Sequence, residues 1–285
     1  MQNEVLFHSN RGGVSSSKML EKLKRIQAGE CDVLYIHTDM TFGLPAKGIR
    51  RGDLLASLLR IIEELRVATL VFPTFTFSFC NDEAYDVQNS KTPMGALNEY
   101  VRKTGRGART HDPLLSVYVL GDKLNLVDDL SEYSIGQDSN YDRLRNCGKN
   151  VKFLFFGADM RACFTYTHYA EAVLGVPYRY DRKFVGTVID EDGRESKNRK
   201  AFLYSTYANC NLNPKFVVYD AMVKKRQLRS ENVGDSALCC FDEKDSYETI
   251  SRLLDTDIFC LTDGKFDTNL KDTTYRREGR IVSVR

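Results

Sequence analysis

The sequence lacks the features that mark several large functional classes. Its 41 basic and 39 acidic residues leave a net charge of only +2, so no strong field attracts nucleic acid or a membrane surface. No apolar run approaches the roughly 20 residues of a membrane-spanning helix, and the polar N-terminus has no apolar signal core. We therefore expect a cytoplasmic protein that binds neither nucleic acid nor a membrane.

Motifs of common nucleotide, hydrolase and metal sites are also missing. The sequence contains no P-loop, no GxGxxG and no GxSxG. Its eight cysteines form no CxxC pair and show no spacing that suits zinc, so we expect free thiols and no metal site. Among them, Cys163 is a candidate nucleophile because it lies close to His168 in the sequence.

Apolar runs alternate with amphipathic segments along most of the chain. The apolar runs predict strands at 33–36, 68–72, 115–120 and 151–156. Helical spacing predicts helices at 19–27, 53–66, 93–103, 165–175, 214–229 and 246–254, and Thr92 is expected to cap the third of them. This alternation favours an α/β fold with a single central mixed, mostly parallel sheet flanked by helices.

The pattern changes in the C-terminal third, where we expect a smaller β-rich excursion. Residues 187–200 are polar, and Asp192-Gly193 is typical of a hairpin turn before a strand at 201–207. The segments 234–241 and 257–261 are expected to be extended. Residues 17–262 are predicted to form one domain, with a flexible segment at 1–16 and a polar tail at 263–285.

His168 and Glu171 form the most informative pair in the chain, which has only four histidines. Residues three apart lie on one face of a helix, so the two side chains would project together. A carboxylate that orients an imidazole and stabilises its protonated form makes the histidine a ready general base. The alternative is an ordinary surface or capping pair.

Polar residues also follow two of the predicted strands. His37, Thr38 and Asp39 come after the first strand, and Thr74 and Thr76 come after Pro73 at the end of the second. Ligands of open α/β sheets gather at the carboxyl ends of strands, so these residues are candidates for a binding site.

Taken in order, these segments resemble the aminoglycoside 3-N-acetyltransferase family, also known as the antibiotic N-acetyltransferases. The resemblance covers roughly residues 17–260. It is carried by residues 33–40, 69–76, 94–97, 109–117, 138–144, 153–157, 168–172, 176–178 and 233–242.

The resemblance implies transfer of an acetyl group from acetyl-CoA to an amine, without a metal. It implies that His168 is the general base and that Glu171 is its acidic partner. CoA would lie across the strand ends, near His37, Thr38, Asp39, Thr74 and Thr76. On the side of the acceptor amine we expect Asp82, Asp112 and Tyr169.

Two departures from the family bear on the acceptor. Family members commonly carry His-Pro where this chain has Asp112-Pro113, and Ser-Ser-Leu where it has Thr38-Asp39-Met40. We therefore expect an N-acetyltransferase that acts on an aminoglycoside or an amino sugar. The alternatives are an N-acyltransferase of nucleotide-linked amino sugars in surface polysaccharide biosynthesis, a CoA-binding relative without catalysis, and a cysteine acyltransferase that uses Cys163. The oligomer is left open, with a homodimer as one form.

Overall fold

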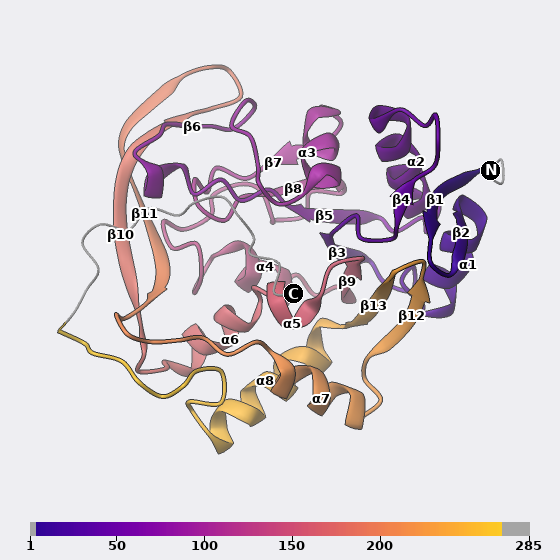
Figure 1. Ribbon diagram of the computed structural model, residues 1–285. Helices are drawn as coiled ribbons and strands as arrows, with labels where there is room; N and C mark the ends of the chain where they lie inside the picture. Colours follow the sequence, from indigo (N-terminus) through magenta and orange to yellow (C-terminus); the bar gives the residue numbers. More distant parts are fainter. Residues whose placement is uncertain (1–3, 270–285) are drawn as a thin grey trace.

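Seven strands form the central sheet of the protein, in the order β12-β13-β9-β3-β5-β8-β7 (Figure 1). The computed structural model describes residues 4–269 of the chain. The strands are β3 (Val33–Thr38), β5 (Thr69–Pro73), β7 (Ala108–Arg109), β8 (Val117–Gly121), β9 (Val151–Phe156), β12 (Arg229–Val233) and β13 (Ser236–Asp242). Strands β9, β3 and β5 run parallel, and the pairs outside them are antiparallel. The predicted α/β fold with a mixed sheet and a parallel core is confirmed.

Both faces of the sheet are buried. In β3, Val33 and Tyr35 face one hydrophobic core, whereas Leu34 and Ile36 face the other, and all four side chains are fully buried. Burial on both faces explains why the central strands are continuous apolar runs rather than alternating ones.

Two layers of helices cover the sheet. Helices α1, α2 and α3 supply Leu23, Leu58 and Leu97 to one core, and the helices α4 to α8 supply side chains such as Tyr169 and Met222 to the other (Figure 1). Their bounds are α1 (Ser16–Arg25), α2 (Arg51–Glu63), α3 (Ala96–Lys103), α4 (Asn140–Asn146), α5 (Met160–Cys163), α6 (Thr167–Leu174), α7 (Phe216–Lys224) and α8 (Glu243–Thr256).

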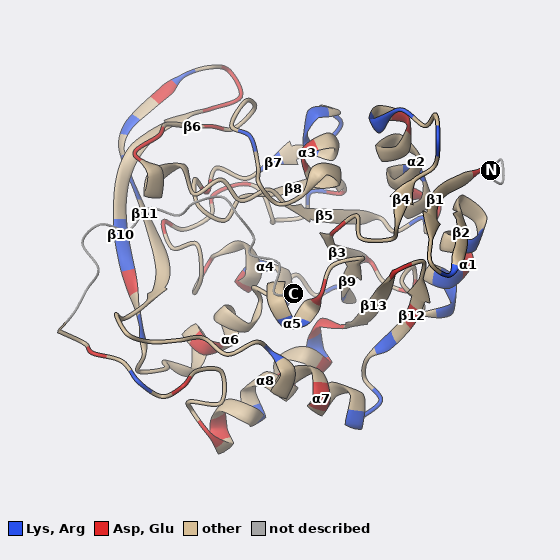
Figure 2. Ribbon diagram, in the orientation of Figure 1, with Lys and Arg blue, Asp and Glu red and all other residues tan. Residues whose placement is uncertain are grey.

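The predicted β-rich excursion is a long hairpin of β10 (Arg179–Ile189) and β11 (Glu195–Thr206). Its turn contains Asp192-Gly193, as expected. The short strand β6 (Tyr85–Asp86) pairs with β10, which gives a three-stranded sheet. Figure 2 shows basic and acidic residues interspersed along this hairpin, so it presents no surface of a single charge.

The prediction of a flexible N-terminal segment is wrong for its described residues. Strands β1 (Val5–Ser9) and β2 (Gly12–Ser15) form an antiparallel hairpin, which β4 (Leu44–Pro45) joins. Leu6 and Phe7 are fully buried, and the ring of Phe7 lies 5.6 Å from that of Phe42. These strands are too short to give a clear pattern, and their stability comes from packing on the rest of the protein.

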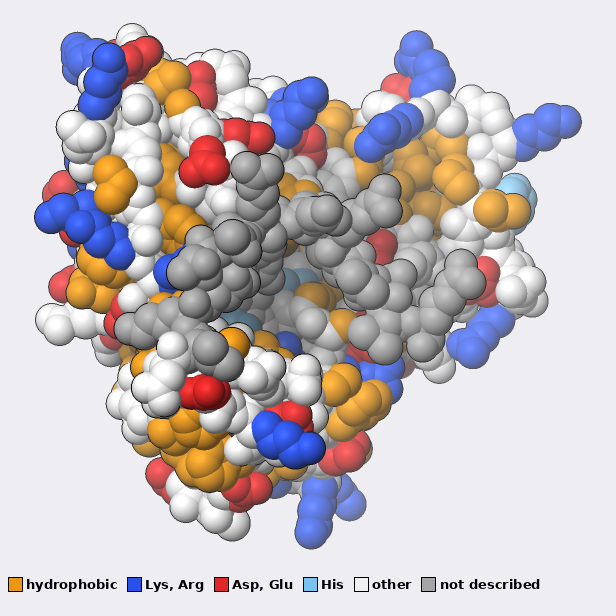
Figure 3. Space-filling model, turned by 60° about the vertical axis from the view of Figure 1, so that its left-hand side comes forward, with side chains coloured by type: hydrophobic (Ala, Val, Ile, Leu, Met, Phe, Trp, Pro, Cys, Tyr) orange, Lys and Arg blue, Asp and Glu red, His pale blue; other side chains and the backbone are white. Residues whose placement is uncertain are grey.

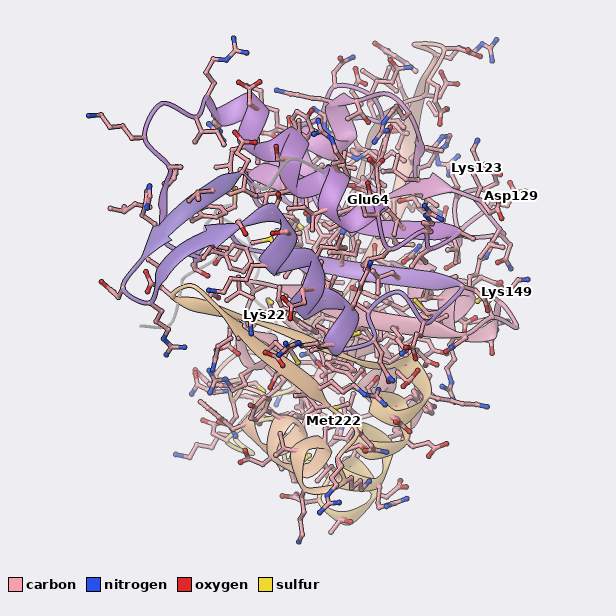
Figure 4. All side chains as sticks on the ribbon, turned by 90° about the vertical axis from the view of Figure 1, so that its right-hand side faces the viewer. Lys22, Glu64, Lys123, Asp129, Lys149 and Met222 are labelled. Atoms are coloured by element: carbon pink, nitrogen blue, oxygen red, sulfur yellow. The ribbon has the colours of Figure 1, made fainter. Side chains whose placement is uncertain are left out.

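Helix α1 joins this N-terminal hairpin to the edge of the central sheet. Lys22 on α1 forms an ion pair of 2.6 Å with Glu231 on β12, and Figure 4 shows the labelled Lys22 between the helix and that edge. Residues 5–16 and the central sheet are therefore linked through α1 as well as through Phe7.

Three local predictions also need correction. Gly95, with φ of 104°, is the N-cap of α3, and the hydroxyl of Thr92 instead donates to the carbonyl of Phe75. Residues 257–261 form turns rather than a strand. The helix predicted at 214–229 ends at Lys224, because the chain turns at Arg226, with φ of 58°, into β12.

Most of the predicted polar tail at 263–285 lies outside the described residues. Within residues 4–269, no helix combines the length and the apolar character that crossing a membrane requires.

Candidate active site

Helix α6 places His168 and Glu171 one turn apart on the same face. The helix ends at Gly175, whose left-handed φ of 69° suits a residue without a side chain. Beyond it the chain reverses, and the backbone amide of Val176 donates to the carbonyl of Glu171 at 3.2 Å. The reversal brings the start of β10 alongside the helix.

Glu171 is the centre of a buried cluster. Its Oε2 lies 2.6 Å from Nδ1 of His168 and 3.0 Å from Nε of Arg179. The hydroxyl of Tyr178 donates to Oε1 at 2.7 Å, and that of Tyr204 donates to the backbone carbonyl of Glu171 at 3.3 Å. The carboxylate is thus held by a cation, an imidazole and a phenol.

Nδ1 of His168 is the ring nitrogen that faces the protein. It lies 2.6 Å from the Glu171 carboxylate and 2.8 Å from Nη2 of Arg179. A carboxylate only accepts and a guanidinium only donates, so Nδ1 with a proton donates to Glu171, and Nδ1 without one accepts from Arg179. In the first tautomer Nε2 carries the lone pair.

The charge states of the pair suit proton transfer. Burial and the charge of Arg179 lower the pKa of His168 to about 4, against the opposing effect of Glu171. Burial alone would raise the pKa of Glu171, but His168, Arg179 and Tyr178 bring it down to about 2. At neutral pH the histidine is therefore a free base beside an ionised carboxylate.

A shallow crevice, which encloses no cavity, opens at the surface beside His168. The side chain of His168 is 21% exposed, and because Nδ1 faces Glu171, the ring edge that bears Nε2 is left to face the crevice. Figure 3 shows histidine side chains in a hollowed part of one face of the molecule. The lining residues are Thr167, His168, Glu171, Leu212, Asn213, Lys215 and Leu261.

The carboxyl end of β3 carries a second buried histidine. His37 is 6% exposed, and its ring stacks on Phe155 with centroids 4.6 Å apart. Its Nε2 has no hydrogen-bond partner among residues 4–269, and burial lowers its pKa to about 3. Thr38 donates to Oδ1 of Asn98 at 2.7 Å, and Asp39 is exposed.

Cys163 lies within electrostatic range of both Asp39 and Lys215. The charges of Asp39 and Lys215 both act on its thiol, and Lys215 also acts on His168. Burial raises the pKa of Cys163 to about 12, so the thiolate that a nucleophile needs does not form near neutral pH. The geometry does not support a cysteine mechanism.

Thr74 and Thr76 follow β5 as predicted, but their hydroxyls serve the protein itself. Thr74 is fully buried, and its Oγ1 accepts from Nε of Arg109 at 3.2 Å. Oγ1 of Thr76 donates to the carbonyl of Pro113 at 2.7 Å. A ligand could reach them only by breaking these bonds, which argues against their assignment to CoA.

Asp82 lies away from His168. It is exposed at the end of η1 (Ser78–Asn81), and Phe79 of that turn packs against Gly186 on β10. Gly186 is seven residues from Arg179, which is roughly 23 Å along a strand. The assignment of Asp82 to the acceptor at His168 is therefore not supported.

Asp112 and Tyr169 are also used within the protein. Oδ1 of Asp112 accepts from the amide of Leu114 at 2.9 Å and from the hydroxyl of Ser134 at 2.8 Å. Tyr169 is 4% exposed and donates to Asp142 on α4 at 2.6 Å. Neither lines the crevice beside His168, so neither assignment to the acceptor is supported.

Sequence reasoning missed the roles of Tyr178, Arg179 and Lys215. Tyr178 was noted only as part of a motif. The glycine that ends α6, followed by Val176-Pro177, was a signal that the chain reverses and returns beside the helix. Lys215 comes from a distant segment, and nothing in the sequence links it to His168. Within residues 4–269, no group of His, Cys, Asp or Glu side chains is arranged to hold a metal ion.

A neutral histidine beside a buried carboxylate is the arrangement that general-base chemistry requires. The family model described as aminoglycoside 3-N-acetyltransferase matches residues 45–255. The chain belongs to this family and is an acyltransferase of its type.

Solved structures of related enzymes share the fold. The YokD protein from Bacillus subtilis is 16% identical, with a TM-score of 0.68, and the match covers 85% of this chain and 94% of that one. AAC-IIIb, solved as a binary complex with CoASH, is 15% identical with a TM-score of 0.68, covering 85% and 96%. AAC-VIa with bound sisomicin is 16% identical with a TM-score of 0.70, covering 85% and 97%. No curated protein sequence matches this chain.

Proposed function

We propose that the protein transfers the acetyl group of acetyl-CoA to an amine of an aminoglycoside or an amino sugar, with His168 as the general base. The observation that carries the proposal is the contact between Nδ1 of His168 and the buried Glu171 carboxylate. Nδ1 is tied to Glu171 at 2.6 Å, which leaves a basic Nε2 at the crevice. An acceptor that enters as an ammonium must lose a proton before its nitrogen can attack a thioester.

In this reaction the residues of the chain manage the proton. An acceptor ammonium first loses one proton to water. As the free amine attacks the thioester, Nε2 of His168 takes a second proton from the nitrogen, and Glu171 stabilises the imidazolium that results. Acetyl-CoA supplies the activated acyl group: a C–N bond forms as the C–S bond breaks. The proton on His168 can then pass to the departing sulfur, so that the histidine returns to its basic form.

The carboxyl end of β3 has the features of a ligand site rather than those of an ordinary hydrophobic core. A buried imidazole nitrogen without a partner is costly unless something bonds to it, and Nε2 of His37 is such an atom among residues 4–269. We propose that His37, Thr38 and Asp39 border the acyl end of CoA. The relative solved with CoASH supports this use of the fold. The crevice encloses no cavity, so most of each substrate would lie outside it.

The acceptor is an aminoglycoside or a less charged amino sugar. Structures of related enzymes with sisomicin and gentamicin favour the first. The crevice favours the second, since Lys215 lines it and the charge of Glu171 is already matched by Arg179. A polycation would gain little from such a lining.

Replacing His168 with Ala tests the proposal. We expect thiol release from acetyl-CoA to fall by about 100- to 10,000-fold. His111→Ala is the matched control, because this histidine is exposed and pairs with the exposed Glu191 at 2.9 Å, so full activity is expected. Near-normal turnover in folded His168→Ala would overturn the proposal.

The same assay separates the acceptors. Thiol release is measured in parallel with aminoglycosides and with nucleotide-linked amino sugars. CoA that raises the melting temperature while no amine releases thiol would instead favour the non-catalytic CoA-binding relative.

A further inference from the structure

Arg179 contacts both members of the catalytic pair, yet the reaction just described gives it no role. Its Nε lies 3.0 Å from Oε2 of Glu171, and its Nη2 lies 2.8 Å from Nδ1 of His168. The side chain is 3% exposed, so water does not screen its charge. A buried cation next to the base of a reaction calls for an explanation.

The β10–β11 hairpin holds this guanidinium in place. Arg179 is the first residue of β10 and pairs with Thr206 across the hairpin. Its Nη1 donates to the carbonyl of Tyr204 at 3.1 Å, and its Cζ lies 5.4 Å from the centroid of the Tyr204 ring. A planar guanidinium with bonds on several sides has little freedom to turn, so its charge is fixed relative to α6.

We infer that Arg179 is a positioning residue for the proposed acyl transfer, which fixes the Glu171 carboxylate against Nδ1 of His168 and keeps the imidazole unprotonated until the acceptor delivers its proton. The inference rests on the proposed function of His168. Two opposite charges act on the ring: Glu171 favours its protonation, and Arg179 opposes it. Glu171 therefore orients the imidazole of His168, while the imidazole stays unprotonated in water.

Other groups near the pair must be counted as well. Lys215, before α7, also opposes protonation of His168. The charge of Arg179 acts on Tyr178, Tyr204 and Cys210, and that of Glu171 acts on the same three and on Cys260. Burial raises the pKa of each of these four groups, so all are neutral at pH 7. Arg179 and Lys215 are thus the cations to consider, and Nη2 of Arg179 lies 2.8 Å from Nδ1 of the ring.

The test is the pH dependence of kcat/KM in Arg179→Met and Arg179→Lys. Loss of the cation should raise the pKa of His168, so the acid limb of the profile should move up by roughly 1 to 2 pH units in Arg179→Met. Arg179→Lys keeps the charge but not the planar fork, so its limb should stay in place while kcat falls.

Lys183→Met is the matched control. Lys183 is an exposed cation four residues along β10, about 13 Å away and beyond the screening length at physiological salt. The acid limb of the kcat/KM profile should not move in Lys183→Met. If Arg179→Met folds poorly, Arg179→Gln removes the charge and retains a donor toward the carbonyl of Tyr204. A uniform loss of activity with an unmoved limb would mean that Arg179 serves packing alone, which would overturn the inference.

A second readout does not depend on activity. The chain has four histidines, so the ring of His168 can be assigned by NMR with His168→Gln and titrated in each variant. Its midpoint should rise from about 4 when Arg179 loses its charge. An unchanged midpoint would overturn the inference even if His168 is catalytic. Activity that survives in His168→Ala would instead overturn the proposed function, so the two failures are distinguishable.

Discussion

At the scale of single residues, the low pKa of His168 has a consequence for activity. The base form is required, and with a pKa of about 4 it persists from neutral pH down to about pH 5. We expect protonation of His168 to lower kcat/KM only below about pH 5. The profile should be measured with acceptors whose amines differ in pKa, because their own protonation gives a separate limb. A limb at pH 6.5 that is common to all acceptors would contradict this prediction.

His37 should make the fold sensitive to acid. Its pKa falls from 6.5 to about 3 on burial, so the unfolded chain binds a proton more readily than the folded one. Its contribution to stability is therefore complete above pH 6.5 and is lost as the pH falls toward 3. His37→Phe, which keeps a ring against Phe155, should lose less melting temperature between pH 7 and pH 5 than the wild type does.

The control for His37 is His8, which is exposed on β1. His8→Ala should retain the full pH dependence of the melting temperature. If His37→Phe loses as much melting temperature as the wild type over this range, His37 is not held neutral by burial.

At the scale of elements, the turn after β9 depends on Gly157. Its φ is 77°, and a Cβ there would lie 2.3 Å from the carbonyl oxygen of Asp39 and 2.8 Å from Cζ of Phe42. Gly148 has a similar φ of 69° but open space around it, so it isolates the backbone effect. Gly148→Ala should cost about 1 kcal/mol of unfolding free energy.

Gly157→Ala should cost about 1–3 kcal/mol more than Gly148→Ala, because the ends of β3 and β9 must move apart. Chemical denaturation of both variants measures the difference. Equal losses would show that the close approach adds nothing to the backbone effect.

The sequence predicted elements where a pattern was local and failed where packing decided. The spacing of His168 and Glu171 and the apolar run of β9 depend only on neighbouring residues, and both predictions are confirmed. Thr92 was predicted to cap α3, but its hydroxyl donates to the carbonyl of Phe75, which follows β5. Arg179 reaches Glu171 only through a reversal of the chain, a contact that no periodicity encodes. The assignment of Thr74 and Thr76 to CoA stays a prediction, and the burial and hydrogen bonds of Thr74 argue against it.

At the scale of the whole molecule, the N-terminal hairpin belongs to the core. Phe7→Ala should cost about 3–5 kcal/mol of unfolding free energy, as expected for a fully buried aromatic side chain. Val5→Ala is the comparison on the same strand, and because Val5 is 40% exposed it should change stability by no more than about 0.5 kcal/mol. A small effect of Phe7→Ala would restore the view of a loosely attached segment.

A homodimer stays a prediction.

The order of strands in the central sheet also governs how the chain can be made. β3 lies between β5 and β9, but β9 is formed by residues 151–156, long after β3 at 33–38. During synthesis, β3 must therefore wait for its second neighbour with the backbone N–H and C=O groups of one edge unpaired, and no local hairpin can close the parallel core early. We expect nascent chains that end before residue 151 to be held by chaperones, and the enzyme to gain its fold only when most of its length has left the ribosome.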